Sequence, residues 1–316
     1  MSQIAMARPD GAEVPEEQWW SVTIMPAAGG GCDAVVVDVV TPLAAQARAW
    51  GAKRWFYTRC LDPARSSLQI RILGSPRLLD RLKPFMLALI DQAIPDHGGL
   101  QTSDYRENPT RWDCGKLSPK GESDLARYGG TEGLALAEQV FELSSDLAAW
   151  ATSRFPKVSS RSTLASLLLF DAAHAMMRGP RASAWPDRRM ISWKYYWDGH
   201  LRGCSAGLNP QELLVNSSLT SQSPQRIRAA QRLMLATAAE PAVDNWRKRW
   251  SRAIDNYLYR SEKVRASRSA QHLTFYQSRL MVNRLGIPAR DEARLGLYAR
   301  SWSKELEPGS LERAGS

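Results

Sequence analysis

A short stretch near the C-terminus concentrates side chains that can move protons. Ser269, His272 and Tyr276 are separated by three and four residues, a spacing that places them on one face of a helix. Their hydroxyl, imidazole and phenol groups both donate and accept protons. The spacing therefore predicts a set of acid–base groups, with Gln277 as a polar neighbour. A solvated polar helix face is the alternative interpretation.

A second cluster is aromatic. Trp193, Tyr195, Tyr196 and Trp197 occupy about one and a half helical turns, so their rings point to more than one side of the helix. Packing in the core explains some of them. A helix does not bury all its sides against one neighbour, so we expect at least one ring to face a cleft.

Other catalytic patterns are missing from the sequence. The four histidines and four cysteines form no HExxH, HxxxH or CxxC pair, no acidic triplet suits a hard metal ion, and there is no GxSxG motif. The Gly29–Gly31 run lacks the pattern of a phosphate-binding loop. We therefore expect no metal site and no cofactor. The roles of His200 and His272, which lie beside the aromatic clusters in the sequence, stay open.

The charge balance points to an anionic partner. Lys and Arg number 42 against 32 Asp and Glu, which gives a net charge of +10. Such a surface attracts nucleic acid, acidic peptides or anionic membranes. Solvated helix faces are the alternative interpretation of each basic patch.

The elements that must position these residues change type along the chain. Trp19–Met25, Lys53–Cys60 and Ser67–Leu73 read as strands, with Leu100–Arg106 as a further candidate. Residues 33–50 are ambiguous, because Val35–Val37 favours a strand and the later apolar spacing favours a helix.

Helical patterns dominate from about Thr131. A first helix begins at Pro76, and others cover 134–154, 163–178, 190–200, 224–239, 242–259, 270–285 and 289–304. The order predicts an α+β fold, in which a strand-rich first third with a mixed or antiparallel sheet packs against helical C-terminal two-thirds. We expect one domain over 19–305, between mobile segments 1–18 and 306–316.

Composition predicts a globular, cytoplasmic protein. Of the 316 residues 44% are hydrophobic and 12 are tryptophan, enough for a substantial core. The longest apolar runs fall short of the roughly 20 residues that span a bilayer, and no secretory signal is visible. We expect no membrane partner; oligomeric state stays open.

Several segments together resemble one family. Trp55–Arg59 with Asp62-Pro63, Leu68–Arg71, Arg127–Gly130, the Ala137–Ser145 helix and Asn283–Ile287 are similar to ordered motifs of the lantibiotic dehydratase C-terminal, thiopeptide-type bacteriocin biosynthesis domain. The matches run from about Trp19 to Leu297 and imply that family's elimination-domain-like fold.

The chain departs from the elimination enzymes of that family, which remove glutamate from glutamylated Ser or Thr. Arg279 stands where the elimination pattern has a histidine. Ser67 and Gln69 replace a histidine and an arginine, and only Arg71 remains of that arginine pair. Asp124 replaces a glutamate, although Arg127 is kept. Loss of a base and a cation implies a neutral peptide substrate.

The resemblance therefore implies a pyridine synthase. Such an enzyme joins two dehydroalanines of a leader-bearing precursor by formal aza-cycloaddition, without a cofactor, and then loses water and leader to close a pyridine-centred macrocycle. In this interpretation Tyr276, His272, Ser269 and Gln277 are catalytic. The expected substrate-binding residues are Trp193, Tyr195, Trp197, Arg71 and Arg127. The azole-rich core of the precursor would stack on the aromatic rings.

An acidic leader peptide accounts for the positive charge, with Arg77, Arg81 and Lys83 as the expected leader-binding residues and no need for nucleic acid. A stand-alone glutamate-elimination enzyme is one alternative. A non-catalytic subunit that binds leader or tRNA is another.

Overall fold

The computed structural model describes residues 17–26, 31–60, 66–93, 100–107, 124–182, 188, 191–205 and 224–302. The predicted mobile ends and the Asp62-Pro63 turn lie largely or wholly outside these ranges. Among the described helices, none is both long enough and apolar enough to cross a membrane.

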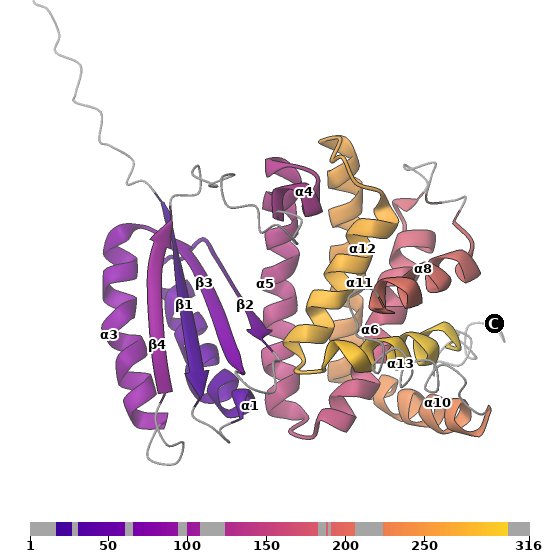
Figure 1. Ribbon diagram of the computed structural model, residues 1–316, viewed down its shortest axis with the longest axis horizontal. Helices are drawn as coiled ribbons and strands as arrows, with labels where there is room; N and C mark the ends of the chain where they lie inside the picture. Colours follow the sequence, from indigo (N-terminus) through magenta and orange to yellow (C-terminus); the bar gives the residue numbers. More distant parts are fainter. Residues whose placement is uncertain are drawn as a thin grey trace, which may run out of the picture.

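Four strands form one antiparallel sheet in the N-terminal third (Figure 1). They are β1 (Gln18–Pro26), β2 (Arg54–Cys60), β3 (Ser67–Gly74) and β4 (Leu100–Glu107), in the order β2-β3-β1-β4. Leu68, Ile70 and Ile72 of β3 are buried and alternate with less buried residues. One face of the sheet is therefore apolar and requires a covering layer.

Helices supply that layer, and they include the ambiguous segment 33–50. It forms α1 (Cys32–Val35), a π-helical turn η1 (Val36–Val40) and α2 (Thr41–Ala49), which pack with α3 (Pro76–Ala93). The buried valines at 35, 36, 39 and 40 recur at helical spacing. Their burial outweighs the local preference of β-branched residues for strands.

The remaining described helices form a second body beside the sheet (Figure 1). They are α4 (Asp124–Tyr128), α5 (Thr131–Arg154), α6 (Val158–Arg178), α8 (Trp193–Ser205), α10 (Pro224–Ala238), α11 (Pro241–Lys263), α12 (Ala270–Arg284) and α13 (Ala289–Arg300). α6 lies at the centre, packed against α10, α11, α12 and α13.

α5 joins the two bodies. It contacts β2 on one side and α11 and α12 on the other. Phe141 of α5 packs edge-on against Phe56 of β2 at 5.2 Å and against Tyr128 of α4 at 5.3 Å between ring centroids. A single core therefore runs from the sheet into the helices.

The predicted α+β class and its order along the chain are confirmed. Element ends differ by a few residues. α8 begins at Trp193 rather than residue 190, and α13 ends at Arg300 rather than residue 304. Such shifts are expected where helix ends are read from periodicity alone.

Candidate functional site

α12 carries the predicted acid–base residues, and its start is set by one of them. Ser269 is the N-cap: its hydroxyl accepts a hydrogen bond from the backbone N–H of His272 at 3.2 Å. The helix ends at Arg284, and Gly286 follows with φ 77°, a conformation that favours glycine. The Ser269 oxygen is therefore used in capping, while its own proton stays available for donation.

His272 and Tyr276 form a contacting pair on the side of α12 that faces α4. Their ring centroids are 4.7 Å apart. His272 Nε2 lies 3.0 Å from the carbonyl oxygen of Arg127, and the Arg127 guanidinium sits over the Tyr276 ring at 5.3 Å. A carbonyl only accepts, so Nε2 carries the proton and Nδ1 is left as the proton acceptor.

The imidazole is held neutral near pH 7. Burial lowers the pKa of His272 below its usual value; the hydrogen bond to the Arg127 carbonyl opposes this shift, and the positive charges of Arg268 and Arg127 add to it. A neutral imidazole with an open Nδ1 is the form that a general base requires.

A cavity of about 260 Å³ opens beside this pair, between α8 and α12. Its wall consists of Tyr196, Gly199, His200, Ser269, Gln271, His272 and Phe275. Tyr276 is not part of the wall, but its ring contacts Phe275 at 5.4 Å, edge-on. Ser269 and His272 therefore lie at a cavity, and Tyr276 contacts its wall.

Only part of the predicted aromatic wall is exposed enough to contact a substrate. Trp197 is fully buried and Trp193 is half-buried, with its Nε1 donating to the Arg300 carbonyl at 3.2 Å. Tyr195 is 57% exposed. Of the three, Trp197 is therefore corrected to a core residue, because its ring has no accessible face for a substrate, and Tyr195 is the open ring.

Gln277 also lies away from the cavity. Its side chain is fully buried and is not part of the cavity wall. The prediction of a catalytic amide at the cavity is corrected here, because a step of one residue from Tyr276 turns the side chain about 100° around the helix.

Arg71 lies on the sheet, in a separate polar cluster. Its guanidinium stacks over the Trp19 ring at 4.9 Å. Glu138 of α5 is its electrostatic neighbour. Burial raises the pKa of Glu138 to about 7, while the charges of Arg71 and Arg54 oppose the rise and Asp124 adds to it.

Glu138 makes the stability of the protein fall as pH rises. Its ordinary pKa of 4.5 applies in the unfolded chain and about 7 in the folded one, so folding takes up a proton between these values. The free-energy cost of ionising Glu138 in the folded protein is absent below pH 4.5 and complete above pH 7. We expect Glu138→Gln to raise the free energy of unfolding by about 1–3 kcal/mol at pH 8, with no gain at pH 4.

Urea unfolding at the two pH values measures this change. Glu142→Gln is the matched control on the same helix, because Glu142 pairs with Arg54 at 2.9 Å and with Arg48 at 3.4 Å. Its loss should cost a few tenths to about 1 kcal/mol at pH 8. A Glu138→Gln variant that is destabilised at pH 8 contradicts the expected sign.

The expected leader-binding residues lie on α3, at the opposite end of the molecule from α8 (Figure 1). Arg77 and Arg81 are exposed, and the Arg81 guanidinium stacks over Trp50 at 4.3 Å. Lys83 pairs with Asp104 of β4 at 3.0 Å. Lys83 is therefore partly neutralised, and the two arginines carry the accessible charge of this set.

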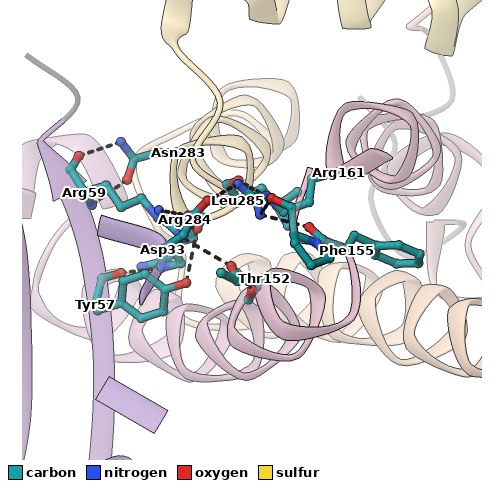
Figure 2. Close-up of polar contacts among 11 residues, drawn as sticks. Asp33, Tyr57, Arg59, Thr152, Phe155, Arg161, Asn283, Arg284 and Leu285 are labelled. Atoms are coloured by element: carbon teal, nitrogen blue, oxygen red, sulfur yellow. Dashed lines mark hydrogen bonds and ion pairs between the residues drawn. The ribbon is translucent and has the colours of Figure 1, made fainter. Parts of the chain in front are cut away.

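A network that the sequence did not indicate joins the sheet to the helices. The Asp33 carboxylate accepts from Arg59 Nη1 and from Arg161 Nη2, both at 2.5 Å. Figure 2 shows these side chains converging from α1, β2 and α6. Both guanidinium groups are buried, so Asp33 supplies the negative charge that two desolvated cations need.

The Asn283–Ile287 motif completes this network. The Asn283 side chain bonds both backbone groups of Arg59, at 2.9 and 2.7 Å, as Figure 2 shows. Arg284 donates to the Tyr57 carbonyl at 2.6 Å and to the Ser144 hydroxyl at 2.8 Å. Two of the motifs that carry the family resemblance thus hold α12 against β2 and do not line the cavity.

A larger cavity, of about 350 Å³, lies between α6, α10 and α13. Ser162, Thr163 and Ser166 in its wall each donate their hydroxyl to a backbone carbonyl one turn earlier. Its two wall cations are Arg226 and Arg294. Among the residues that the structure describes, this wall holds no histidine or carboxylate, so the smaller cavity offers the better acid–base chemistry.

Comparison with models of known protein families identifies one family. A family model described as lantibiotic biosynthesis dehydratase C-term matches residues 19–302. No match to the sequences of curated proteins is found.

Three solved structures share the fold. The tRNA-dependent lantibiotic dehydratase MibB from Microbispora sp. 107891 has 19% identity and a TM-score of 0.52 over 98% of this chain, which spans only 29% of the length of MibB. The pyridine synthase TbtD from thiomuracin biosynthesis has 15% identity and a TM-score of 0.57, covering 90% of this chain and 96% of its own. TsrL has 16% identity and a TM-score of 0.53, covering 90% and 94%.

Proposed function

The chain belongs to the lantibiotic biosynthesis dehydratase C-terminal family, and on that premise we propose that it is a pyridine synthase acting on a thiopeptide precursor. The observation that carries the proposal is the cavity between α8 and α12, where neutral polar groups and aromatic rings meet. TbtD, a pyridine synthase, shares the fold over nearly its whole length.

The reaction needs positioning more than a cofactor. One dehydroalanine and its preceding amide, as the iminol, form an azadiene, and the second dehydroalanine adds to it through two new carbon–carbon bonds. Water then leaves from the former amide carbon, and the leader leaves as its carboxamide from the α-carbon of the second dehydroalanine. Holding the two alkenes together removes an entropic barrier of up to about 7–11 kcal/mol.

The residues at the cavity fit the proton transfers that remain. Nδ1 of His272 accepts the proton that leaves nitrogen or a ring carbon, and the Ser269 hydroxyl donates to the departing oxygen or nitrogen. Tyr276, which is not part of the wall, is proposed to act through His272, whose ring it contacts. Arg127 fixes His272 through its carbonyl and covers the Tyr276 ring, which keeps the pair in place.

The arginines argue against glutamate elimination. An eliminated glutamate needs cations that no protein carboxylate already occupies. Arg127 pairs with Asp124 at 2.6 Å, and Arg71 has Glu138 as its electrostatic neighbour. A substrate glutamate would compete with both acids, whereas a neutral peptide would not.

A defined precursor tests the proposal. The purified protein is incubated with a synthetic thiopeptide precursor bearing two dehydroalanines and an intact leader, and products are read by mass spectrometry. Release of a leader carboxamide together with loss of water supports the synthase. Loss of glutamate from a glutamylated peptide supports elimination instead, and binding without either reaction supports a non-catalytic subunit.

Tyr195 is the ring expected to stack on the substrate azoles. Tyr195→Ala should weaken binding of the core peptide by about 1–3 kcal/mol, using stacking of bases on aromatic rings as the analogue. Calorimetric titration with an azole-bearing core peptide measures the change.

The control for that change is Tyr105→Ala on β4, where the side chain is 48% exposed. It should bind core peptide as the wild type does. Equal affinity in the Tyr195→Ala variant would remove this ring from the binding surface. Trp193→Ala is less informative, because that ring also packs on Phe170 and Trp197.

The partner in this proposal is a precursor peptide with an acidic leader. Arg77 and Arg81 of α3 are its proposed contacts, since both are exposed. Because α3 and α8 lie at opposite ends of the molecule, leader and core would contact different bodies of the protein (Figure 1). Leader affinity should then fall with salt and on reversal of both arginines to Glu.

A further inference from the structure

Three side chains of metal-ligand type meet behind the cavity wall. His200 and Cys204 are four residues apart on α8, so they share one face of the helix, and Glu292 of α13 lies opposite them. One ligand atom from each lies within 4.8 Å of the other two. His200 Nε2 and Cys204 Sγ are 3.5 Å apart.

The cluster is buried and incompletely satisfied. The three residues are each 2% exposed or less. Oε1 of Glu292 and Nδ1 of His200 have no hydrogen-bond partner in the part of the chain that the structure describes, and of the two only Oε1 would be satisfied by an ion that His200 holds through Nε2. Such groups are costly to bury without a partner, and each needs an explanation.

The surrounding packing brings the two helices together at this point. A Cβ added to Gly296 of α13 would lie 2.7 Å from Cδ2 of His200, so only glycine allows this approach. Trp197 and Phe275 pack edge-on against the imidazole at 5.3 and 5.5 Å. The imidazole is therefore held in one orientation toward Cys204.

We propose that His200, Cys204 and Glu292 bind a divalent metal ion of the zinc type. Zinc takes nitrogen, sulfur and oxygen ligands together, at about 2.0–2.1 Å from histidine nitrogen and about 2.3 Å from sulfur. Tetrahedral bonds of these lengths place nitrogen and sulfur about 3.5 Å apart, which is the observed separation. Magnesium and calcium prefer all-oxygen sites, so the thiolate disfavours them.

The charges of the cluster agree with a bound ion. A thiolate and a carboxylate together balance two positive charges, which makes burial of the complex tolerable. Arg279 is the nearest competing cation, but its Nε is 4.0 Å from Glu292 Oε2, beyond hydrogen-bond distance. His200 is also part of the cavity wall, whereas Cys204 and Glu292 are not among the wall residues.

The ion would tie α8 to α13 behind the cavity. This site shares His200 with the wall of the proposed cycloaddition cavity, but the proton transfers of the cycloaddition were assigned to other residues, at the start of α12. Binding of the metal and formation of the pyridine are therefore tested apart, and failure of one leaves the other standing.

Cobalt is the probe. The full chain is stripped with a chelator under reducing conditions and titrated with Co²⁺, with zinc used to displace it. We expect one ion per chain, a thiolate-to-cobalt charge-transfer band in the near ultraviolet, and a tetrahedral visible spectrum that zinc removes. Zinc should also raise the melting temperature.

Two variants and one control locate the site. Cys204→Ser should remove the charge-transfer band, and Glu292→Gln should keep the band but weaken cobalt binding. Cys60→Ser removes an exposed thiol on β2 and should leave both band and affinity unchanged. Circular dichroism checks that each variant is folded.

The proposal is overturned by either of two results. Wild-type protein that binds less than stoichiometric cobalt and zinc has no such site. A band that survives in Cys204→Ser, or disappears in Cys60→Ser, places the metal elsewhere. If Cys204→Ser does not fold, the metal stoichiometry of the wild type and the cobalt titration of Glu292→Gln still decide whether the site exists.

Discussion

Removing either member of the His272–Tyr276 pair is expected to lower turnover about 100- to 10,000-fold, the usual contribution of a positioned acid or base. His272→Ala removes the proton acceptor Nδ1, and Tyr276→Phe removes a phenol proton while keeping the ring that contacts His272 at 4.7 Å between ring centroids. The measurement is single-turnover conversion of a dehydroalanine-bearing precursor, so that product release does not mask the chemical step.

The pH profile distinguishes a base from a structural residue. Arg127 of α4, Arg268 before α12, Tyr276 on α12 itself and His200 across the cavity face or neighbour His272. Because the pKa of His272 is lowered, the neutral base persists below pH 6.5, its ordinary value. The wild-type rate should therefore be level near pH 7 and fall only at more acidic pH.

The His272→Ala variant should turn over more slowly, and its rate should no longer fall at acidic pH. Tyr105→Phe, on exposed β4, is the control and should turn over as the wild type does. Wild-type rates in both pair variants would remove them from the mechanism. A wild-type acid limb centred above pH 6.5 would assign it to another group.

Asp33→Asn is expected to produce the largest loss of stability among these variants. It keeps the shape of the side chain but leaves the buried guanidinium groups of Arg59 and Arg161 without their shared negative charge. Losing one partner of a buried ion pair costs about 3–5 kcal/mol. The Asp33 side chain is 36% exposed, so solvent compensates in part and we expect about 2–4 kcal/mol.

Urea unfolding at pH 7 measures that loss as a shift in midpoint at constant slope. Asp38→Asn is the matched control, an exposed aspartate five residues along the same segment, and should change stability by less than about 0.5 kcal/mol. A loss below about 1 kcal/mol in Asp33→Asn would mean that the two arginines find sufficient compensation in the backbone carbonyls they also bond.

Much of the fold follows from local pattern. The alternation of Leu68, Ile70 and Ile72 identifies β3, and helical periodicity locates α5, α6, α11 and α12 to within several residues. Where local signals disagree, as over residues 33–50, the valines favoured a strand, and their burial against α3 and α5 decided for helix. Propensity differences of a few tenths of a kcal/mol per residue do not withstand such burial.

Some features of the candidate site could likewise be predicted from local sequence, and others depend on tertiary packing. Spacing on one helix is local information, so Ser269, His272 and Tyr276 could be grouped from the sequence, and they lie together at the N-terminal half of α12. Which ring of α8 stays open could not be predicted. Trp197 and Tyr195 differ by two positions, and only the packing of α13 against α8 decides which one is covered.

Sequence alone determined the class of protein: the order of strands and helices, the family motifs and the grouping of Ser269, His272 and Tyr276 along one helix. Tertiary structure alone decided the long-range polar sites. Asp33 meets arginines 26 and 128 residues away, and Glu292 meets Cys204 across two helices. Neither Asp33 nor Glu292 could be recognised from the sequence, because a single carboxylate forms no periodic pattern. What selects these partners is the desolvation cost of a buried charge, which arises only once the helices have packed.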